Sequence, residues 1–513
     1  MAHQNTVRIA RNTAMLYVRM LVMMFVTMYA SRVVLRTLGQ SDNDIYSLVG
    51  SFVAIFWFLN TAMATATQRF LNVEMGRGDM AAMQRVFSMS VNVHIGIALV
   101  ILVLGETIGL WWVNNLLDIP GARMGAANWV YQFALLTSCL NIVRVPYNAT
   151  IIAHERMSFY AVISIAEAVL RLGAVLLLVV LPGDKLILYA VLTCLVVLTV
   201  TLIYRAYGKR QFATCRYRFE RDKALARRMI GFSGWSLLGA GANSASQKGI
   251  EVMFNMVVGR GLNLAADLAG QISSAVYAFV LNFQTAFNPQ IMKSHAAGDN
   301  DYFRYLIFRA SKYSYFLLLF IAVPVVMCAE ALLSLWLGAE MVPEHTVAFT
   351  RLLMGFLLVD AISGPLWTAV QATGNIRRYQ ILMSSIIFLN LPLAYLVLRA
   401  GMPPESAFAV RLGMNIIAFA VRVGYLGRNL GFPVWAYVRQ VVLVAAVVTA
   451  LAVPVPMWVA CHTEGLRGLI LTTLSSCVWT GAVIFAVGMG RSERGFVIRA
   501  IRKRLGRKEA GDV

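Results

Sequence analysis

Residues Ser233 to Asn255 are apolar enough to span a membrane as one helix, yet they include Lys248 and Glu251. Ionisable groups at membrane depth are costly and normally face a water-filled cavity or a partner. Polar groups in this stretch recur at steps of four or seven residues and therefore share one helix face. The face comprises Ser236, Asn243, Gln247, Glu251 and Asn255. It predicts that the chain moves or binds a polar solute inside a membrane.

Ionisable side chains also occur in other apolar stretches. The cations are Arg19, Arg171, Lys248, Arg351 and Arg411, and the acids are Glu167, Glu251 and Asp360. Arginine stays charged and offers a planar fork of donors to phosphate oxygens, so the cations predict contacts to an anionic head group. The acids are candidates for carrying a coupling proton or Na⁺.

Local ion pairing is the alternative role for four of these groups. Glu167 and Arg171 lie four residues apart, and Lys248 and Glu251 lie three apart. Either spacing lets two opposite charges meet on one helix. A purely structural role therefore stays open for both pairs.

The other charged groups have no such local partner. Arg351 and Asp360 lie nine residues apart, so each needs a partner elsewhere. Arg19 has no nearby acid in the sequence and is the strongest candidate for head-group contact. Arg411 lies close to the outer end of its span, where snorkelling is the alternative.

Uncharged polar residues in the spans are candidate sugar contacts. They are Asn60, Thr61, Thr65, Gln68, Asn243, Gln247, Gln271, Ser274 and Asn282. Hydrogen bonding between helices explains such residues equally well.

Composition places these residues in a polytopic membrane protein. The 513 residues are 59% hydrophobic and 13% charged, with a mean hydropathy of +0.69; a soluble protein carries about twice this charged fraction. Apolar runs of about 20 residues recur throughout, which predicts an all-α polytopic fold. We place fourteen spans at residues 13–36, 45–67, 86–113, 127–150, 158–181, 185–206, 230–258, 265–289, 304–328, 347–371, 379–399, 405–427, 435–460 and 466–489.

The net charge of +21 follows the positive-inside rule and does not indicate nucleic-acid binding. Most Lys and Arg residues fall in segments on the side of the N-terminus, so both termini are predicted to be cytoplasmic. The basic tail from Arg499 to Lys508 is either a lipid-binding segment or a topology anchor. The first apolar run contains Arg19 and is too long for a cleavable signal, so we expect a retained span. The six cysteines show no metal-type spacing, and we expect no disulfide, metal or cofactor.

Three landmarks recur at nearly constant distance along the chain. Gly78-Asp79 and Gly298-Asp299 are 220 residues apart, and the segments 153–160 and 372–379 are 219 apart. Pro-containing turns near Pro182 and Pro403 follow at a similar offset. These matches predict two parallel six-helix repeats with a substrate site between them, followed by two further helices. The predicted divisions are 1–206 and 230–427 for the bundles, 207–229 for a basic linker, 428–490 for the extra helices and 491–513 for the tail.

The helix pattern, the Gly-Asp loops and the segment from Leu38 to Tyr46 resemble the polysaccharide flippases of the MOP superfamily. This resemblance implies two bundles that alternate between inward-open and outward-open states in a bacterial inner membrane. It also implies an undecaprenyl-pyrophosphate-linked oligosaccharide as cargo, membrane lipids as partners, and glycan polymerase or ligase machinery as further partners.

Two other functions are compatible with this composition. A MATE-type multidrug antiporter is the alternative transporter, although an excess of intramembrane cations suits an anionic cargo better. A membrane-bound glycan polymerase or ligase would need a large outer loop with clustered charges, which the sequence lacks, so we expect no enzyme. No nucleotide-binding loop of the GxxxxGK[ST] type occurs, and this favours an ion gradient or the membrane potential as energy source.

Overall fold

The computed structural model describes residues 12–23, isolated residues between 25 and 49, and residues 57–115, 119–254, 257, 262–337, 342–463, 465–490 and 493–495. The chain forms two compact units. Unit 1 comprises residues 1–241, 285–303 and 368–381, and unit 2 comprises residues 242–284, 304–367 and 382–513. The predicted bundle boundaries follow the sequence repeat and stay a prediction.

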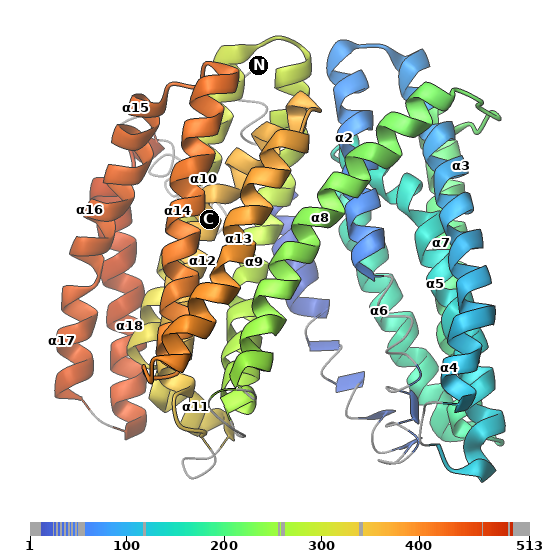
Figure 1. Ribbon diagram of the computed structural model, residues 1–513, viewed down its shortest axis with the longest axis horizontal. Coiled ribbons are helices and arrows are strands. Elements are labelled where there is room, and N and C mark those ends of the chain that lie inside the picture. The colour runs from blue at the N-terminus through green and yellow to red at the C-terminus, as the bar shows by residue number, and fades with distance from the viewer. Residues whose placement is uncertain are drawn as a thin grey trace, which may run out of the picture. The chain divides into compact units, whose positions relative to one another are not determined.

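Unit 1 is built from long helices around a central α5. The helices are α2 (Trp57–Arg77), α3 (Met80–Leu104), α4 (Leu110–Asn115), α5 (Met124–Ala153), α6 (Met157–Val180), α7 (Lys185–Gln211) and the first part of α8 (Lys223–Met253). Helix α5 packs against α2, α3 and α7 (Figure 1). Its Tyr131 is fully buried and donates a hydrogen bond of 2.7 Å to the carbonyl of Gly105. Gly105 begins a π-helical segment (Gly105–Gly109) that joins α3 to α4.

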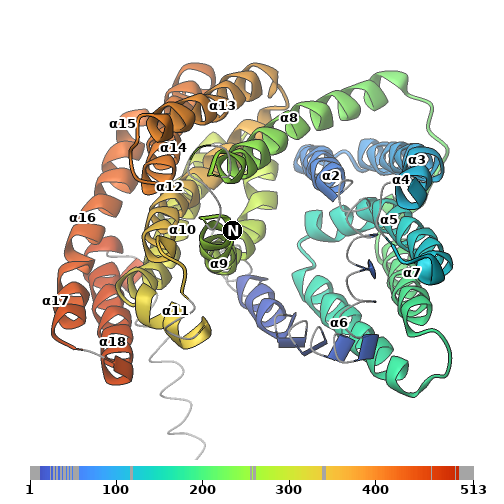
Figure 2. The ribbon, with the colours of Figure 1, turned by 60° about the horizontal axis from the view of Figure 1, so that its bottom comes forward.

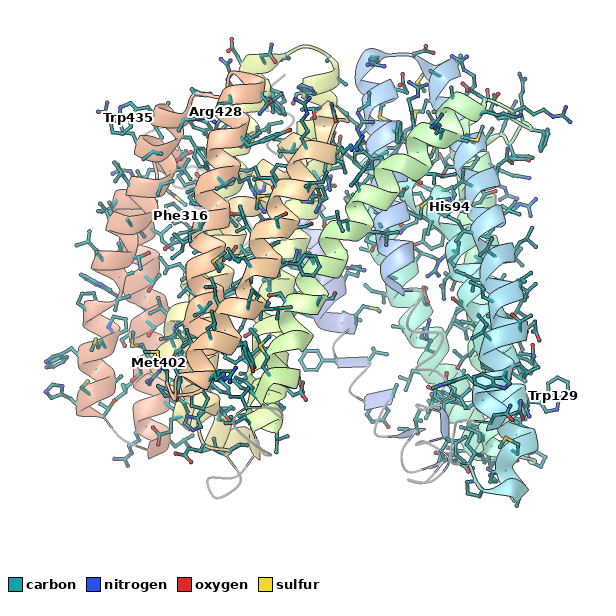
Figure 3. All side chains as sticks on the ribbon, viewed as in Figure 1. His94, Trp129, Phe316, Met402, Arg428 and Trp435 are labelled. Carbon is teal, nitrogen blue, oxygen red and sulfur yellow. The ribbon has the colours of Figure 1, made fainter. Side chains whose placement is uncertain are left out.

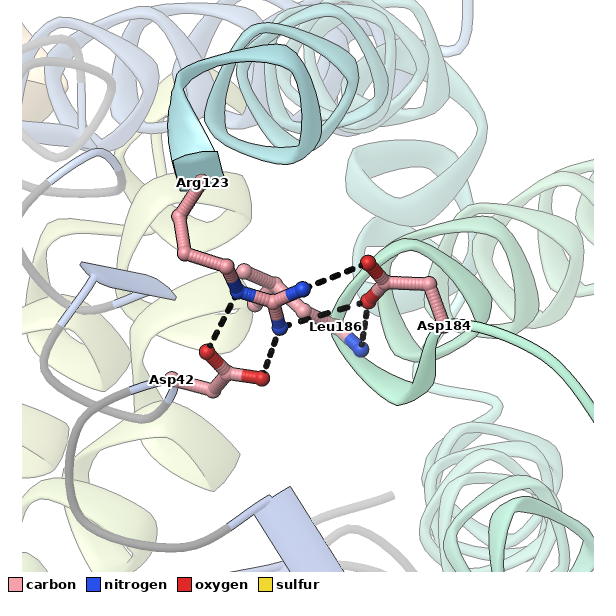
Figure 4. A network of polar contacts seen from close by, with 4 residues as sticks. All are labelled: Asp42, Arg123, Asp184 and Leu186. Carbon is pink, nitrogen blue, oxygen red and sulfur yellow. Dashed lines mark hydrogen bonds and ion pairs between the residues drawn. The ribbon is translucent and has the colours of Figure 1, made fainter. Parts of the chain in front are cut away.

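One arginine ties three segments of unit 1 together (Figure 4). Arg123 precedes α5 and pairs with Asp42 and with Asp184, the latter at 2.7 Å. Asp184 also caps α7, because its Oδ1 accepts a hydrogen bond of 3.0 Å from the Leu186 amide. Asp42 belongs to the segment Leu38–Tyr46 that carries part of the family resemblance. This segment therefore includes an anchor for neighbouring helix ends.

Unit 2 contains the second part of α8, most of the next five long helices and the C-terminal helices. They are α9 (Leu262–Ala296), α10 (Asn300–Met327), α11 (Ala329–Leu337), α12 (Thr346–Thr373), α13 (Arg377–Arg399), α14 (Glu405–Leu430), α15 (Val434–Tyr437), α16 (Leu443–Ala452), α17 (Pro454–His462) and α18 (Gly465–Val483). Phe254, Phe349 and Phe408 stack in one buried cluster. Helices α16, α17 and α18 lie together at one edge of unit 2 (Figure 2).

The predicted all-α membrane architecture is confirmed. Ten helical segments in the described part of the chain are long and apolar enough to span a membrane. Helices α5 and α8 have 30 and 31 residues, so they are also long enough, although they are more polar. The first predicted span and the start of the second lie only partly within the described residues.

The two Gly-Asp landmarks have the same local structure. Gly78 and Gly298 both adopt left-handed backbone conformations, with φ of 76° and 77°. The following Asp79 and Asp299 each cap the next helix by accepting a hydrogen bond from a backbone amide three residues later, at 2.8 and 3.0 Å. The sequence repeat therefore corresponds to a repeat of helix ends and caps.

Candidate functional site

Arg19, the strongest sequence candidate for head-group contact, lies against an aromatic side chain in unit 1. Its guanidinium carbon is 4.7 Å from the centre of the Tyr160 ring, and its Nη1 donates a hydrogen bond of 3.3 Å to the Tyr160 hydroxyl. Tyr160 lies in the first turn of α6, within the repeated segment 153–160. Arg19 is thus partly engaged by the protein, and its proposed contact with cargo stays a prediction.

Glu167 lies between two arginines. It pairs with Arg171 on its own helix at 2.9 Å, as the spacing of four residues predicts, and with Arg144 of α5 at 3.0 Å. Arg144 is not among the charged residues predicted from the sequence, because the packing of α5 against α6 is not visible from either helix alone. Two cations around one acid leave a positive charge in the cluster, and Arg171 is its more exposed member.

The charged residues of unit 2 that lack a partner on their own helix have contacts with residues of other helices. Asp360 accepts a hydrogen bond from the Tyr277 hydroxyl. Arg351 donates through Nε to the Val326 carbonyl at 3.3 Å. The Arg411 guanidinium lies 4.5 Å from the centre of the Phe356 ring. These contacts connect α9, α10, α12 and α14, and the roles in cargo binding or ion coupling stay predictions.

The predicted sugar contacts are scattered within the described residues. Asn243 and Gln271 are exposed, and Thr65 and Gln68 are half-buried. Asn282 donates to the Ala278 carbonyl of its own helix at 2.8 Å. The side chains of Asn60, Thr61, Gln247, Lys248 and Glu251 lie outside the described residues. The structure therefore does not describe the charged pair on the polar face of α8.

A basic pocket in unit 1 brings together arginines from three separate segments of the sequence. The last turns of α2, the first turns of α8 and the loop between α12 and α13 surround a cavity of about 420 Å³. We call it the arginine pocket. Its charged lining residues are Arg69, Arg77, Arg227, Arg228, Arg377 and Glu74. Five arginines and one glutamate give it a formal charge of +4.

Arg69 forms the buried wall of the arginine pocket. Its Nε donates a hydrogen bond of 2.9 Å to the Gln371 carbonyl, and its Nη2 donates one of 3.4 Å to the Ala372 carbonyl. The guanidinium also lies 4.7 and 5.3 Å from the centres of the Phe70 and Phe232 rings. Backbone carbonyls and aromatic faces thus hold this arginine in place without neutralising its charge.

Gly374 makes room for Arg69. It has φ +83°, and a Cβ at this position would lie 2.1 Å from the Arg69 Nη2. A side chain here would collide with the guanidinium and strain the backbone at the same time. Arg377, which begins α13 directly after this loop, lies 5.3 Å from the ring of Trp235, another lining residue of the pocket.

The exposed cations leave the pocket able to bind an anion. Arg227, Arg228 and Arg377 are exposed, whereas Arg77 pairs with Glu74 at 3.2 Å. Guanidinium groups bind phosphate oxygens through two parallel hydrogen bonds, and the pocket offers several such groups on an aromatic floor. The arrangement fits a phosphate or pyrophosphate better than a cationic ligand.

The repeat counterpart of Gly374 lies at a second contact between the two halves of the sequence. Glu155 occupies the matching position in the segment 153–160, and it also has a positive φ, 57°. Its Oε1 accepts hydrogen bonds from Lys293 at 2.7 Å and from Gln290 at 2.6 Å. Within unit 1, the loop 372–379 therefore contacts the end of α2, which precedes Gly78-Asp79. The loop 153–160 contacts the end of α9, which precedes Gly298-Asp299. Each contact joins the two halves of the sequence.

Comparison with known proteins identifies the fold. No protein-family model and no curated protein matches the sequence. Solved structures do match: a MATE transporter in a straight conformation aligns with a TM-score of 0.72 at 14% identity, over 85% of this chain and 97% of that chain. The fold is that of the MATE transporters.

Two further structures show the breadth of this MATE fold. A Vibrio cholerae MATE transporter aligns with a TM-score of 0.69 at 15% identity, over 84% of this chain and 99% of that chain. A MOP-superfamily transporter from Pyrococcus furiosus aligns with a TM-score of 0.68 at 13% identity, over 83% of this chain and 96% of that chain. It is described as having a binding pocket of reverse polarity that suggests a different function. The helical transporter fold expected from the sequence is thus shared with these solved structures.

Proposed function

We propose that this protein is a secondary transporter that flips an undecaprenyl-pyrophosphate-linked oligosaccharide from the inner to the outer leaflet. The observation that carries the proposal is the arginine pocket, whose formal charge of +4 suits a pyrophosphate group. The distribution of basic residues along the sequence supports a cytoplasmic position for this pocket, where such a cargo would enter.

The two matched loop contacts supply an element that can open and close. Arg69 with the Gly374 loop, and Glu155 with Lys293, each join segments from different halves of the sequence within unit 1. We propose that both contacts close the cytoplasmic side and that their breakage accompanies inward opening. A pyrophosphate bound in the arginine pocket would compete with the backbone carbonyls for Arg69 and so couple loading to this change.

The alternative is a MATE-type multidrug antiporter. Its support is the fold, because one of the matching structures is described as a multidrug resistance MATE transporter in an outward-facing conformation. The five arginines of the pocket argue against cationic drugs, since like charges repel at the point of binding. The reverse-polarity structure supports the view that this fold serves cargoes of different charge.

Loss of the protein in its own host tests the proposal. The proposed function predicts accumulation of lipid-linked repeat units on the cytoplasmic leaflet and loss of surface glycan. Restoration by the wild-type chain and by Arg378→Gln, but not by Arg377→Gln, would connect the phenotype to the arginine pocket. Arg378 is the matched control, because it is exposed and adjacent to Arg377 but does not line the pocket. Normal glycan export together with new sensitivity to cationic dyes would instead support the multidrug antiporter.

A further inference from the structure

A second basic groove lies in unit 2, among helices that take no part in the arginine pocket. The start of α10, the segment from α15 to α16 and the end of the last helix enclose about 580 Å³. We call it the C-terminal groove. Its cations are Arg304, Arg309, Lys312 and Arg439, and its acid is Glu493. Four cations and one acid give a formal charge of +3.

The cations of this groove differ in how strongly the protein engages them. Glu493 pairs with Lys312 at 3.0 Å and with Arg309 at 3.3 Å, and it accepts a further hydrogen bond of 2.7 Å from the Gly490 amide. These contacts hold the pKa of Glu493 below its ordinary value although burial opposes the shift. Arg439 is exposed and makes no ion pair or hydrogen bond with the part of the chain that the structure describes. The groove thus already holds one carboxylate and retains cationic capacity for another anion.

Apart from Gln440 and the Tyr305 hydroxyl, the other side chains that line the groove are apolar. Val441 is buried in its wall, and Phe308, Val444 and Val487 are among the other apolar lining residues. Trp435, 75% exposed, lies one turn before Arg439 and is predicted to sit at the inner membrane interface (Figure 3). A ligand that fits this groove has an anionic head beside the arginines and a hydrocarbon chain along the valines.

The backbone of both C-terminal helices departs from α-helical geometry at the groove. Val438–Val442 and Ile484–Gly488 are π-helical, and both contribute lining residues. Such segments are frequent at functional sites. Gly488 additionally permits close packing, because a Cβ there would lie 2.7 Å from the Phe316 ring of α10. Small residues and altered helix geometry therefore shape this groove.

We propose that the C-terminal groove binds an anionic phospholipid of the cytoplasmic leaflet, with its phosphate on Arg304 and Arg439 and an acyl chain against Val441 and Val444. The site is separate from the arginine pocket, and it does not depend on which cargo the transporter carries. Arginines near a membrane surface attract anionic lipids, and the apolar wall gives the site a preference for a lipid over a free phosphate. Glu493 engages the neighbouring Arg309 and Lys312, and its negative charge opposes a second anion in the same groove.

Native mass spectrometry of the full chain in detergent tests this site, with phosphatidylglycerol and phosphatidylcholine of identical acyl chains as probes. We expect phosphatidylglycerol to bind more tightly than phosphatidylcholine, and Arg439→Gln to weaken it about fivefold. Arg304→Gln should have a similar effect. Arg428→Gln is the matched control, because Arg428 is exposed at the end of α14 and does not line the groove (Figure 3).

Several outcomes would overturn the proposal. Equal binding of the two lipids would make the groove a purely apolar surface, and equal losses in R439Q and R428Q would make the attraction diffuse. Displacement of phosphatidylglycerol by excess inorganic phosphate would reassign the site to a free anion. Glu493→Gln removes a negative charge from the groove and is expected to tighten phosphatidylglycerol binding, and unchanged or weaker binding would contradict an electrostatic attraction of the headgroup. Gel filtration shows whether R439Q is folded; if it is not, R304Q decides.

Discussion

Replacing Gly374 with alanine should displace Arg69 in the arginine pocket and so lower the free energy of unfolding. A control substitution at Gly78 separates this effect from backbone strain. Gly374 has φ +83°, and a Cβ there would lie 2.1 Å from the Arg69 Nη2. Gly78 has nearly the same backbone conformation, φ +76°, but a Cβ there would meet nothing within 4 Å. Both substitutions strain the backbone, and only Gly374→Ala displaces Arg69.

The two costs can be given magnitudes. A non-glycine residue in the left-handed conformation costs about 1–2 kcal/mol, so we expect Gly78→Ala to lower the free energy of unfolding by about that amount. A hydrogen bond from a charged group contributes about 1.5–3 kcal/mol. The added Cβ displaces the Arg69 guanidinium, whose Nη2 bonds the Ala372 carbonyl and whose Nε bonds the Gln371 carbonyl. Loss of these contacts adds about 2 kcal/mol, so Gly374→Ala should cost about 3–4 kcal/mol in total.

Unfolding in mixed micelles, followed by circular dichroism, measures these values. In an Arg69→Ala background, the additional cost of Gly374→Ala should fall to the backbone strain alone, about 1–2 kcal/mol. The coupling between the two positions would then be about 2 kcal/mol. Equal costs for Gly374→Ala and Gly78→Ala, or a coupling near zero, would refute the claim that the glycine positions this arginine.

Three further predictions concern individual side chains. Glu155→Ala should lower the free energy of unfolding by about 3 kcal/mol, because Glu155 is buried and the substitution removes its ion pair with Lys293. Glu344→Ala is the control, since its side chain is 90% exposed, and it should cost less than about 0.5 kcal/mol; equal costs would contradict the buried pair. The folded-state pKa of Glu493 is below its ordinary value of 4.5, so its stabilising contribution is present above that pH and is lost as the pH falls through the lowered pKa. The difference in melting temperature between the wild type and Glu493→Gln should therefore shrink on acidification. A difference that stays constant with pH would exclude this linkage. Burial raises the pKa of the Cys215 thiol to about 12, so a maleimide at pH 8 should not label a variant whose only cysteine is Cys215. It should label a variant whose only cysteine is the exposed Cys461. Labelling of the two variants at similar rates would show that the loop after α7 opens.

Patterns along the sequence predicted the membrane helices, the repeat and the local ion pair. The left-handed glycines at positions 78 and 298 and the capping aspartates after them follow from a Gly-Asp pair between two apolar runs. The Glu167–Arg171 pair follows from the helical spacing. These features depend on residues that are close in sequence, where helix geometry fixes the distance.

The arginine pocket depends on contacts that sequence spacing does not encode. Arg69 binds backbone carbonyls about 300 residues away, and any residue type can supply a carbonyl. Arg144 reaches Glu167 only because α5 packs against α6. The sequence did contain one signal for these contacts, because the segments 153–160 and 372–379 match each other. The first segment carries Glu155, which contacts Lys293, and the second carries Gly374, which lies beside Arg69. The π-helical segments of the C-terminal groove have no comparable sequence signal.

Transport in proteoliposomes tests the central claim most directly. The chain is reconstituted in vesicles that carry a fluorescent undecaprenyl-pyrophosphate oligosaccharide, and a membrane-impermeant quencher reports its movement between leaflets. We predict flipping by the wild type and by Arg378→Gln, and a loss of about tenfold in Arg377→Gln, equivalent to about 1.4 kcal/mol of lost pyrophosphate contact. Absence of flipping by the wild type, together with uptake of a cationic dye driven by an ion gradient, would contradict the account.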